Sequence, residues 1–255
     1  MRRWLPELLA LPLLPWLHAQ GERTRRITPR LPEADGAREG LCTPPDVSDA
    51  VPVILIAVGE SPVAGVGVER QDEAITAQLA QALAVALTRP VQWRAFGKNG
   101  ATVADASREV LPQLRQLPEL QAGEIRIVLI AFGVNDSTAF HSTGRYRRDL
   151  EVLARALQQQ LSPHLLIISG APPLHLFPAL PQPLRHVLGM KAAALSRAAQ
   201  QLATELPQAI YVPVRSDVRE RSLMAHDGYH PSAAGARLWA QQLTQATVAG
   251  LAAQK

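Results

Sequence analysis

Short apolar runs that end at or near a glycine recur along the chain, and they limit its fold more than any other feature. The clearest are residues 51–58, 126–131 and 164–169. Each is rich in aliphatic residues without the polar alternation of a half-exposed strand, which is typical of strands buried on both faces of a parallel sheet. Two further segments, 91–96 and 210–212, predict the remaining strands, the latter a short one.

Helical patterns fill the stretches between these runs. Apolar residues at helical spacing predict helices over residues 71–88, 102–117, 145–161, 184–205 and 231–250. Strands that alternate with helices across short connections require right-handed crossovers and helices on both sheet faces. The sequence therefore predicts one α/β domain whose active loops lie at the carboxyl ends of its strands.

Composition excludes several classes of protein. Hydrophobic residues make up 47% of the 255 residues and charged residues 19%, so the chain is neither disordered nor a polytopic membrane protein. Cys42 is the only cysteine, which excludes an intrachain disulfide and a zinc site built on several thiolates. The net charge of +4 is modest, and we expect no nucleic-acid partner.

The N-terminal segment has a different character. Residues 1–19 place two arginines before a run rich in Leu and Pro that also holds Trp4 and Trp16, and residues 20–30 add four arginines. The run resembles a signal peptide, but Glu7 and three prolines interrupt it, and it is shorter than the ~20 apolar residues of a spanning helix. Peripheral membrane contact through residues 1–30 is the interpretation we favour.

Two alternatives to membrane contact stay open, namely an arm that packs on the domain surface or is disordered, and an atypical cleaved signal. Whether the protein is cytoplasmic, membrane-associated or secreted depends on which of these three interpretations of the N-terminal segment is correct. Residues 31–50 mix Pro, Gly and acidic residues and are typical of a linker. The predicted organisation is an N-terminal arm and linker over residues 1–45, followed by a single α/β domain over residues 46–255 that carries the candidate site residues.

The first candidate site residue is Ser61, which follows the first strand in Gly59-Glu60-Ser61. A serine in a tight turn between a buried strand and a helix can offer a nucleophilic hydroxyl and a backbone N–H donor together. A plain turn or helix-capping serine is the alternative. A phosphate-binding loop is excluded because neither G-x-x-x-x-G-K-[ST] nor G-x-G-x-x-G occurs here.

Two further candidates follow the second and third strands. Gly100 lies in Gly97-Lys98-Asn99-Gly100, where a flexible turn leaves a bare N–H, and Asn135 ends the third strand with an uncharged NH2 donor suited to an oxyanion. The alternatives are an ordinary turn with Thr102 as helix cap, and an Asx turn or cap at Asn135.

The last candidate pair is Asp227 and His230, in Asp227-Gly228-Tyr229-His230-Pro231. Three residues apart in a turn, the carboxylate can hold the imidazole in the tautomer whose Nε2 acts as a base. A loop histidine that caps a helix is the alternative. The other histidines lack ligand spacing, so we expect no metal and no cofactor.

In order, these motifs resemble those of the SGNH/GDSL hydrolases, of the bacterial GDSL-like lipase/acylhydrolase kind, over about residues 51–250. The resemblance implies a flavodoxin-like three-layer α/β/α sandwich with a five-stranded parallel sheet. It implies Ser61 as nucleophile, His230 and Asp227 as base and orienting acid, and Ser61, Gly100 and Asn135 as oxyanion donors. The first motif departs from the family's Gly-Asp-Ser, because Glu60 adds a methylene to the usual Asp.

The function this implies is metal-independent hydrolysis of a carboxylic ester by an esterase, a lipase or lysophospholipase, or a deacetylase. Its partner would be a small-molecule or lipid ester. Apolar residues in the Pro-rich loop 171–183 favour a hydrophobic acyl chain if that loop lines the crevice. The alternative function is a non-catalytic binding or membrane-associated module on the same fold.

Overall fold

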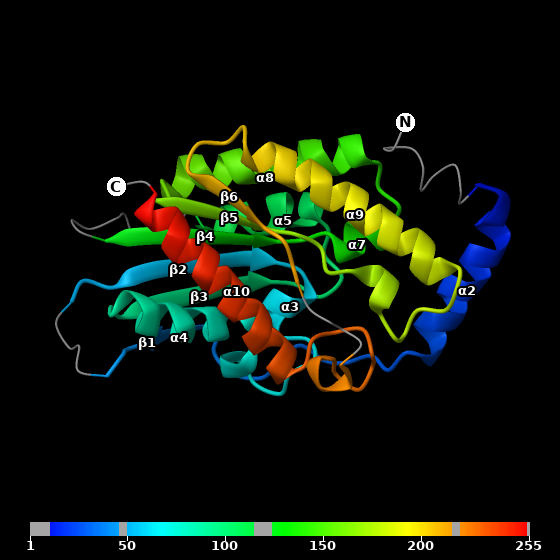
Figure 1. The fold of residues 1–255 in the computed structure, drawn as a ribbon, viewed down its shortest axis with the longest axis horizontal. Helices are drawn as coiled ribbons and strands as arrows, with labels where there is room; N and C mark the ends of the chain where they lie inside the picture. The colour runs from blue at the N-terminus through cyan, green and yellow to red at the C-terminus, as the bar shows by residue number, and fades with distance from the viewer. Residues whose placement is uncertain (1–10, 46–49, 115–123, 216–219, 254–255) are drawn as a thin grey trace.

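A computed structural model, which describes residues 11–45, 50–114, 124–215 and 220–253, contains a six-stranded mixed sheet between two layers of helices (Figure 1). Along the sheet the strand order is β1-β3-β2-β4-β5-β6. The strands are β1 Glu39–Cys42, β2 Val53–Gly59, β3 Val91–Gly97, β4 Ile125–Ala131, β5 Leu165–Ser169 and β6 Ala209–Val212.

The predicted five-stranded parallel sheet is confirmed. β2 lies between β3 and β4 and pairs in parallel with both, and β5 and β6 extend the sheet beyond β4. The chain therefore leaves β2 on one side toward β3 and later returns on its other side as β4. A crevice forms at the carboxyl ends of strands where the order reverses in this way, and this places the active loops beyond β2.

β1 adds a sixth strand that the sequence did not predict. Residues 39–42 lie inside the segment interpreted as a linker, yet they pair antiparallel with the outer edge of β3. The strand has only four residues, one of them Gly40, and its side chains alternate between exposed and half-buried. Such a short edge strand carries no hydrophobic signal and forms because β3 offers unpaired backbone groups.

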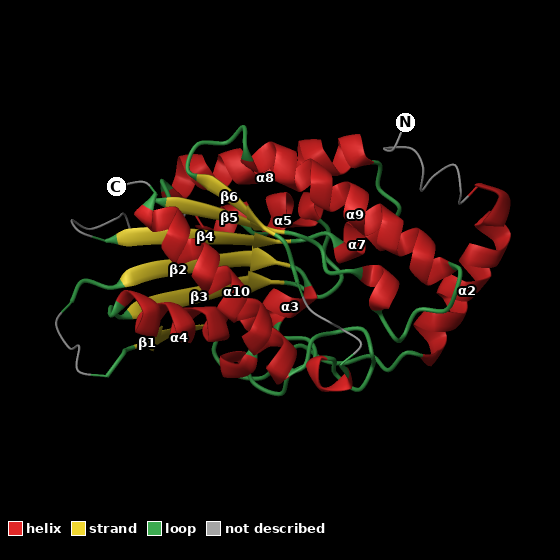
Figure 2. Cartoon of the chain, viewed as in Figure 1, coloured by secondary structure: helices red, strands yellow, loops and turns green. Residues whose placement is uncertain are grey.

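Helices cover both faces, as the alternating pattern predicted (Figure 2). On one face lie α4 Ile75–Leu87 and α10 Ala233–Ala252. On the other lie α5 Val103–Glu109, α6 Leu111–Leu114, α8 Thr143–Leu161 and α9 Leu184–Ala203. A 3-10 turn, η2 Gln71–Glu73, precedes α4, and the predicted helix 102–117 is divided into α5 and α6, with residues 115–117 outside the described part.

Two cores sandwich the sheet because successive strand residues face opposite sides. Along β2, Leu55 and Ala57 pack toward α4 and α10, whereas Ile56 and Val58 pack toward α8 and α9. All four side chains are at most 1% exposed, so both faces of this strand are dry. The continuous apolar run that predicted a doubly covered strand is explained by this arrangement.

One helix of fourteen residues and several short helices gather where the parallel strands end. They are η1 Leu11–Leu13, α2 Leu14–Ile27, α3 Ser61–Ala64, α7 Val134–Thr138, η3 Leu174–Leu176 and η4 Arg221–Leu223. In Figure 1 the arrowheads of β2 and β4 point toward the end of the molecule where α2 lies beside α9. Within the described ranges, no helix combines the length and the apolar character needed to cross a bilayer.

Candidate active site

Ser61 begins α3 directly after β2, and it is only 6% exposed. Its hydroxyl donates a hydrogen bond to Asn99 Oδ1 at 2.8 Å. Asn99 lies in the loop after β3, so this bond joins the ends of two neighbouring strands. The hydroxyl is held at the crevice by a neutral acceptor.

Glu60, the residue before Ser61, fastens the same turn to the end of β4. Its carboxylate oxygens accept the backbone N–H groups of Val134 and Asn135, each at 2.9 Å. The side chain is buried, and burial raises the pKa of Glu60 to about 8, although these hydrogen bonds to the carboxylate limit the rise. The side chain of Glu60 thus links the end of β2 to the start of α7.

Asn135 lies in the first turn of α7 and reaches toward the loop after β3. Its Nδ2 donates to the carbonyl oxygen of Ala101 at 3.0 Å. Gly100, the residue before Ala101, adopts a φ of +78°, which favours glycine, and an added Cβ there would meet no atom within 4 Å. Gly100 and Asn135 therefore lie at one place on the sheet edge, and the open space beside Gly100 leaves room for a ligand.

Asp227 and His230 form a hydrogen-bonded pair before α10. Nδ1 of His230 lies 2.6 Å from Oδ2 of Asp227, and Oδ1 of Asp227 accepts the backbone N–H groups of Tyr229 and His230 at 2.9 and 3.0 Å. Burial acts to raise the pKa of Asp227, but the hydrogen bonds from His230 and Tyr229 outweigh it and lower that pKa. The carboxylate is thus held ionised against Nδ1.

A close backbone approach positions this loop. Gly67, in the segment after α3, adopts a φ of +103°, and an added Cβ would lie 2.3 Å from the carbonyl oxygen of Pro231 and 2.9 Å from Cβ of His230. Only glycine allows this approach. The segment that follows Ser61 is therefore packed directly against the loop that carries His230.

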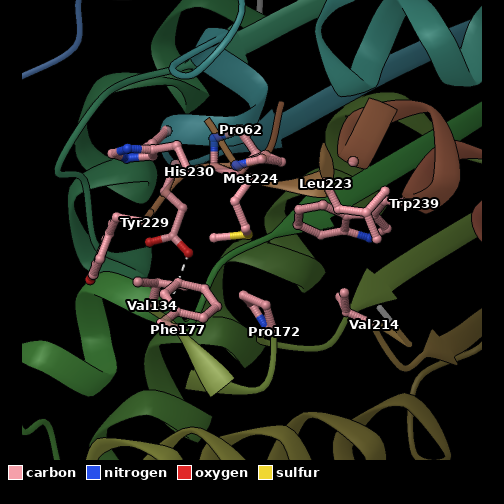
Figure 3. A pocket seen from close by; sticks show the side chains of 14 residues that line it. Pro62, Val134, Pro172, Phe177, Val214, Leu223, Met224, Tyr229, His230 and Trp239 are labelled. Atoms are coloured by element: carbon pink, nitrogen blue, oxygen red, sulfur yellow. Dashed lines mark hydrogen bonds between the residues drawn. The ribbon is translucent and has the colours of Figure 1, made fainter. Parts of the chain in front are cut away.

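Ser61 and His230 line one small apolar pocket of about 50 Å³. Figure 3 shows the His230 ring near Pro62 at one end of this pocket, with Tyr229 and Phe177 on one side and Trp239 toward the far end. The rings of Phe177 and Tyr229 pack edge to face with centroids 5.4 Å apart. Part of the Pro-rich loop 171–183 thus lines the crevice, through Pro172 and Phe177.

The five predicted site residues come from four separate loops. Ser61 follows β2, Gly100 follows β3, Asn135 follows β4, and Asp227 and His230 precede α10. Hydrogen bonds link the first three loops to one another, and the small pocket joins Ser61 to His230. The Asn135 side chain does not cap α7, the alternative considered for it. Its amide NH2 donates to the carbonyl oxygen of Ala101 instead.

The sequence alone did not predict the roles of Asn99 and Tyr229 or the contacts of Glu60. Asn99 lies in a glycine-rich turn, and no sequence pattern predicted its hydrogen bond with the Ser61 hydroxyl. Tyr229 is half-buried, desolvation raises its pKa, and its ring packs on both Phe177 and His230. A tyrosine two residues after Asp227 carried no signal for that packing.

A second Asp–His pair lies behind the site. Oδ1 of Asp136 lies 2.9 Å from Nδ1 of His141, and its Oδ2 accepts the N–H of Val103 at 3.2 Å. Asp136 is fully buried, so this pair ties α7 to the start of α5. Across the described residues, no three His, Cys, Asp or Glu side chains converge as a metal site would require.

Comparison with known families gives a match to the GDSL-like lipase/acylhydrolase family over residues 57–238. The matched range includes all five predicted site residues and leaves α2 and β1 outside it. No curated protein sequence matches the chain.

Solved structures share the fold. The lipase Lip_vut3 from a goat rumen metagenome superposes with a TM-score of 0.59 at 15% identity, covering 76% of this chain and 97% of that one. The psychrotrophic esterase EstA from Pseudoalteromonas sp. gives 0.57 at 18% identity, with 78% and 98% covered. Est24, a carbohydrate acetylesterase from Sinorhizobium meliloti, gives 0.55 at 16% identity, with 77% and 99% covered.

Proposed function

The chain belongs to the GDSL-like lipase/acylhydrolase family, and from that premise we propose that it cleaves carboxylic esters with Ser61 as nucleophile. Ester hydrolysis follows from the family itself. The observation that carries the residue roles is the Asp227–His230 pair, whose 2.6 Å hydrogen bond lies beside the pocket that Ser61 also lines.

The first half of the reaction forms an acyl-enzyme. The Ser61 hydroxyl turns from Asn99 to Nε2 of His230 by rotation about its Cα–Cβ bond, and catalytic hydrogen bonds often form only when substrate is present. Oγ attacks the ester carbonyl carbon while His230 takes the proton, and Asp227 stabilises the resulting imidazolium through Nδ1. His230 then protonates the leaving alkoxide as the ester bond breaks.

Three N–H donors stabilise the tetrahedral intermediate. They are the backbone N–H groups of Ser61 and Gly100 and the Asn135 side chain, whose amide has a second N–H besides the one bonded to Ala101. Water then attacks the acyl-enzyme with His230 again as the base, which releases the carboxylic acid and restores Ser61.

The test combines turnover with covalent labelling. We expect Ser61→Ala and His230→Ala each to abolish most hydrolysis of p-nitrophenyl acetate, and Ser61→Ala also to lose labelling by a serine-directed phosphonate. Ser107→Ala, at a serine on α5 whose hydroxyl bonds to Val103, serves as the matched control. Turnover in folded Ser61→Ala at the wild-type rate would reject the mechanism. A wild-type protein without turnover or labelling would favour a binding module on this fold.

We also propose that residues 1–30 contact a membrane surface, on the basis of exposed apolar side chains on the described part of that arm. Leu11, Trp16 and Ile27 are 61%, 57% and 67% exposed. Arg23, Arg25 and Arg26 on the same helix are exposed as well. Exposed aromatic and aliphatic side chains beside arginines suit the interface of an anionic bilayer.

A further inference from the structure

α2 is fixed across the end of the sheet that carries the active loops. Leu17 is 6% exposed and packs in one apolar cluster with Leu184 and Leu188 of α9. Gln20 adds two hydrogen bonds, in which Nε2 donates to Gln182 O at 2.6 Å and Oε1 accepts Leu184 N–H at 3.1 Å. The helix is therefore docked on the domain at one defined place.

A groove of about 560 Å³ runs between α2 and the candidate active site. Asn99, Asn135 and His230 lie on its inner side. Its apolar walls come from α2 on one side and from the Pro-rich loop and α9 on the other, through Leu14, Leu17, Leu180, Leu184 and Leu188. Thus α2, which the sequence presented as a separate arm, completes a wall of the site.

The groove and the small pocket differ in what they can hold. A cavity needs ~10–15 Å³ to hold one water, so the pocket of about 50 Å³ beside Ser61 has room for only a few non-hydrogen atoms. The groove is roughly ten times larger on the same measure. His230 lines both, so an ester bond at His230 would direct one substituent into each.

We propose that the groove behind α2 binds the linear hydrocarbon chain of an ester substrate, while the small pocket takes the short substituent on the other side of the ester bond. This rests on the proposed function. Leucine walls suit methylene groups. Of the charged side chains in the lining, Glu22 and Arg25 are exposed and pair with each other at 2.6 Å, Arg30 is exposed, and Asp227 is bonded to His230. The long chain is either the acyl group or the alcohol, and the two sources share this chemistry.

Gly21 offers a way to fill the groove without disturbing the fold. It lines the groove from α2, and an added Cβ would meet no atom within 4 Å. A larger side chain at this position projects into open space, and it also favours the helix relative to glycine. We therefore choose Gly21→Phe, with Gly21→Leu as a smaller obstruction. Gly21→Ala and Ala19→Phe, the latter at an exposed α2 position outside the groove lining, are the controls.

The experiment measures kcat/KM on two series of esters. One series is ethyl esters of acids from two to twelve carbons, and the other is acetate esters of alcohols of the same lengths. We expect Gly21→Phe to lower kcat/KM by about tenfold or more for the long members of one series, as steric changes in apolar pockets do. Acetate with the shortest alcohol should be unaffected, and Gly21→Leu should give a smaller effect. Which series responds identifies the source of the chain.

A binding measurement separates failure of this inference from failure of the proposed function. In the Ser61→Ala background, calorimetry with decanoate and with decanol measures chain binding where no turnover is needed. We expect Gly21→Phe to weaken binding of at least one of them by about tenfold and Ala19→Phe to leave it unchanged. Equal effects on short and long esters, or unchanged binding of both chains, would overturn the groove assignment even if Ser61 is confirmed as nucleophile.

Discussion

Glu60 is the residue at which the chain departs from the Gly-Asp-Ser motif of its family. Its side chain makes contacts that link the turn before Ser61 to α7. The carboxylate bonds to two consecutive backbone N–H groups at the start of α7. One of them belongs to Asn135, the proposed oxyanion donor. The longer side chain is therefore part of what positions Asn135 relative to Ser61.

The buried carboxyl group predicts a pH dependence of stability. The folded pKa of about 8 exceeds the 4.5 of an ordinary Glu, so between these values the folded state binds more protons than the unfolded state. The free energy of unfolding should then fall as pH rises through this window, by about 1.4 kcal/mol for each pH unit at most. Glu60→Gln should remove this part of the slope.

Urea denaturation of both proteins at intervals between about pH 5 and pH 8 measures the difference in slope. Glu69→Gln, which removes an exposed carboxylate, should keep the wild-type slope. The absolute stability of Glu60→Gln is not the readout, because the amide also loses one hydrogen bond to α7. Identical slopes in wild type and Glu60→Gln would contradict the raised pKa.

Asn135 allows a test of the oxyanion site by itself. Asn135→Ala should lower kcat for p-nitrophenyl acetate on the order of 10²–10³, about what one such donor contributes. KM should change little, because the amide interacts most strongly once charge develops on the carbonyl oxygen.

Ser137→Ala separates this effect from damage to α7. The buried Ser137 hydroxyl donates to Gly133 O, so its loss costs α7 a hydrogen bond, about 1 kcal/mol, without removing a proposed catalytic donor. It should lower the thermal midpoint and leave kcat unchanged. If Asn135→Ala behaves like Ser137→Ala, with lowered stability and normal kcat, the oxyanion role of Asn135 is wrong.

At the scale of helices and strands, the sequence predicted the elements whose own residues are buried. The five parallel strands and the long helices carry continuous or periodic apolar patterns, because each is covered by neighbouring layers. β1 and α2 escaped prediction for the opposite reason. β1 has four residues with no apolar pattern, and α2 buries only Leu17 and Thr24 of its fourteen residues. Both are stabilised by partners distant in sequence.

The exposed face of the N-terminal arm predicts vesicle binding. Leu11 and Trp16 are mostly exposed and lie outside the groove lining. Each such side chain contributes about 1.5–3 kcal/mol when fully buried. A Leu11→Ser, Trp16→Ser double variant should therefore bind phosphatidylserine-containing vesicles at least about tenfold more weakly, with short-ester hydrolysis unchanged.

Vesicle sedimentation at low and high salt checks this prediction. High salt should weaken wild-type binding, since the arginines of α2 act through screened charge. Val152→Ser, at an exposed apolar position on α8, should bind like wild type. Equal binding by the double variant would show that this face of the arm does not contact lipid.

At the scale of the whole molecule, the site could be predicted only in part. The carboxyl edge of a parallel sheet gathers loops by topology, which is why Ser61, Gly100 and Asn135 were predictable as neighbours. The Ser61–Asn99 bond depends on the packing of side chains from separate loops, which no local pattern encodes. The same holds for the groove, because one of its walls lies outside the range that matches the family.

Segments before β2 therefore contribute to the molecule in two different ways, and truncation should separate them. Removing residues 1–30 deletes α2, which buries little of itself, so the domain should fold and retain short-ester hydrolysis while losing its preference for long chains.

Removing residues 1–45 also deletes β1 and Glu33, whose carboxylate accepts the Asn99 N–H at 2.7 Å. It exposes the edge of β3 and frees the residue that holds the Ser61 hydroxyl, so both the thermal midpoint and turnover of the acetate ester should fall. Thermal denaturation and kcat on one preparation of each protein decide the matter. Full-length Glu33→Ala reports the loss of the Asn99 contact with β1 in place, and Arg38→Ala controls for the ion pair that Glu33 also makes with Arg38. Equal stability and turnover in the two truncated proteins would show that β1 and Glu33 are dispensable, and misfolding of the shorter deletion would show that α2 belongs to the folding unit.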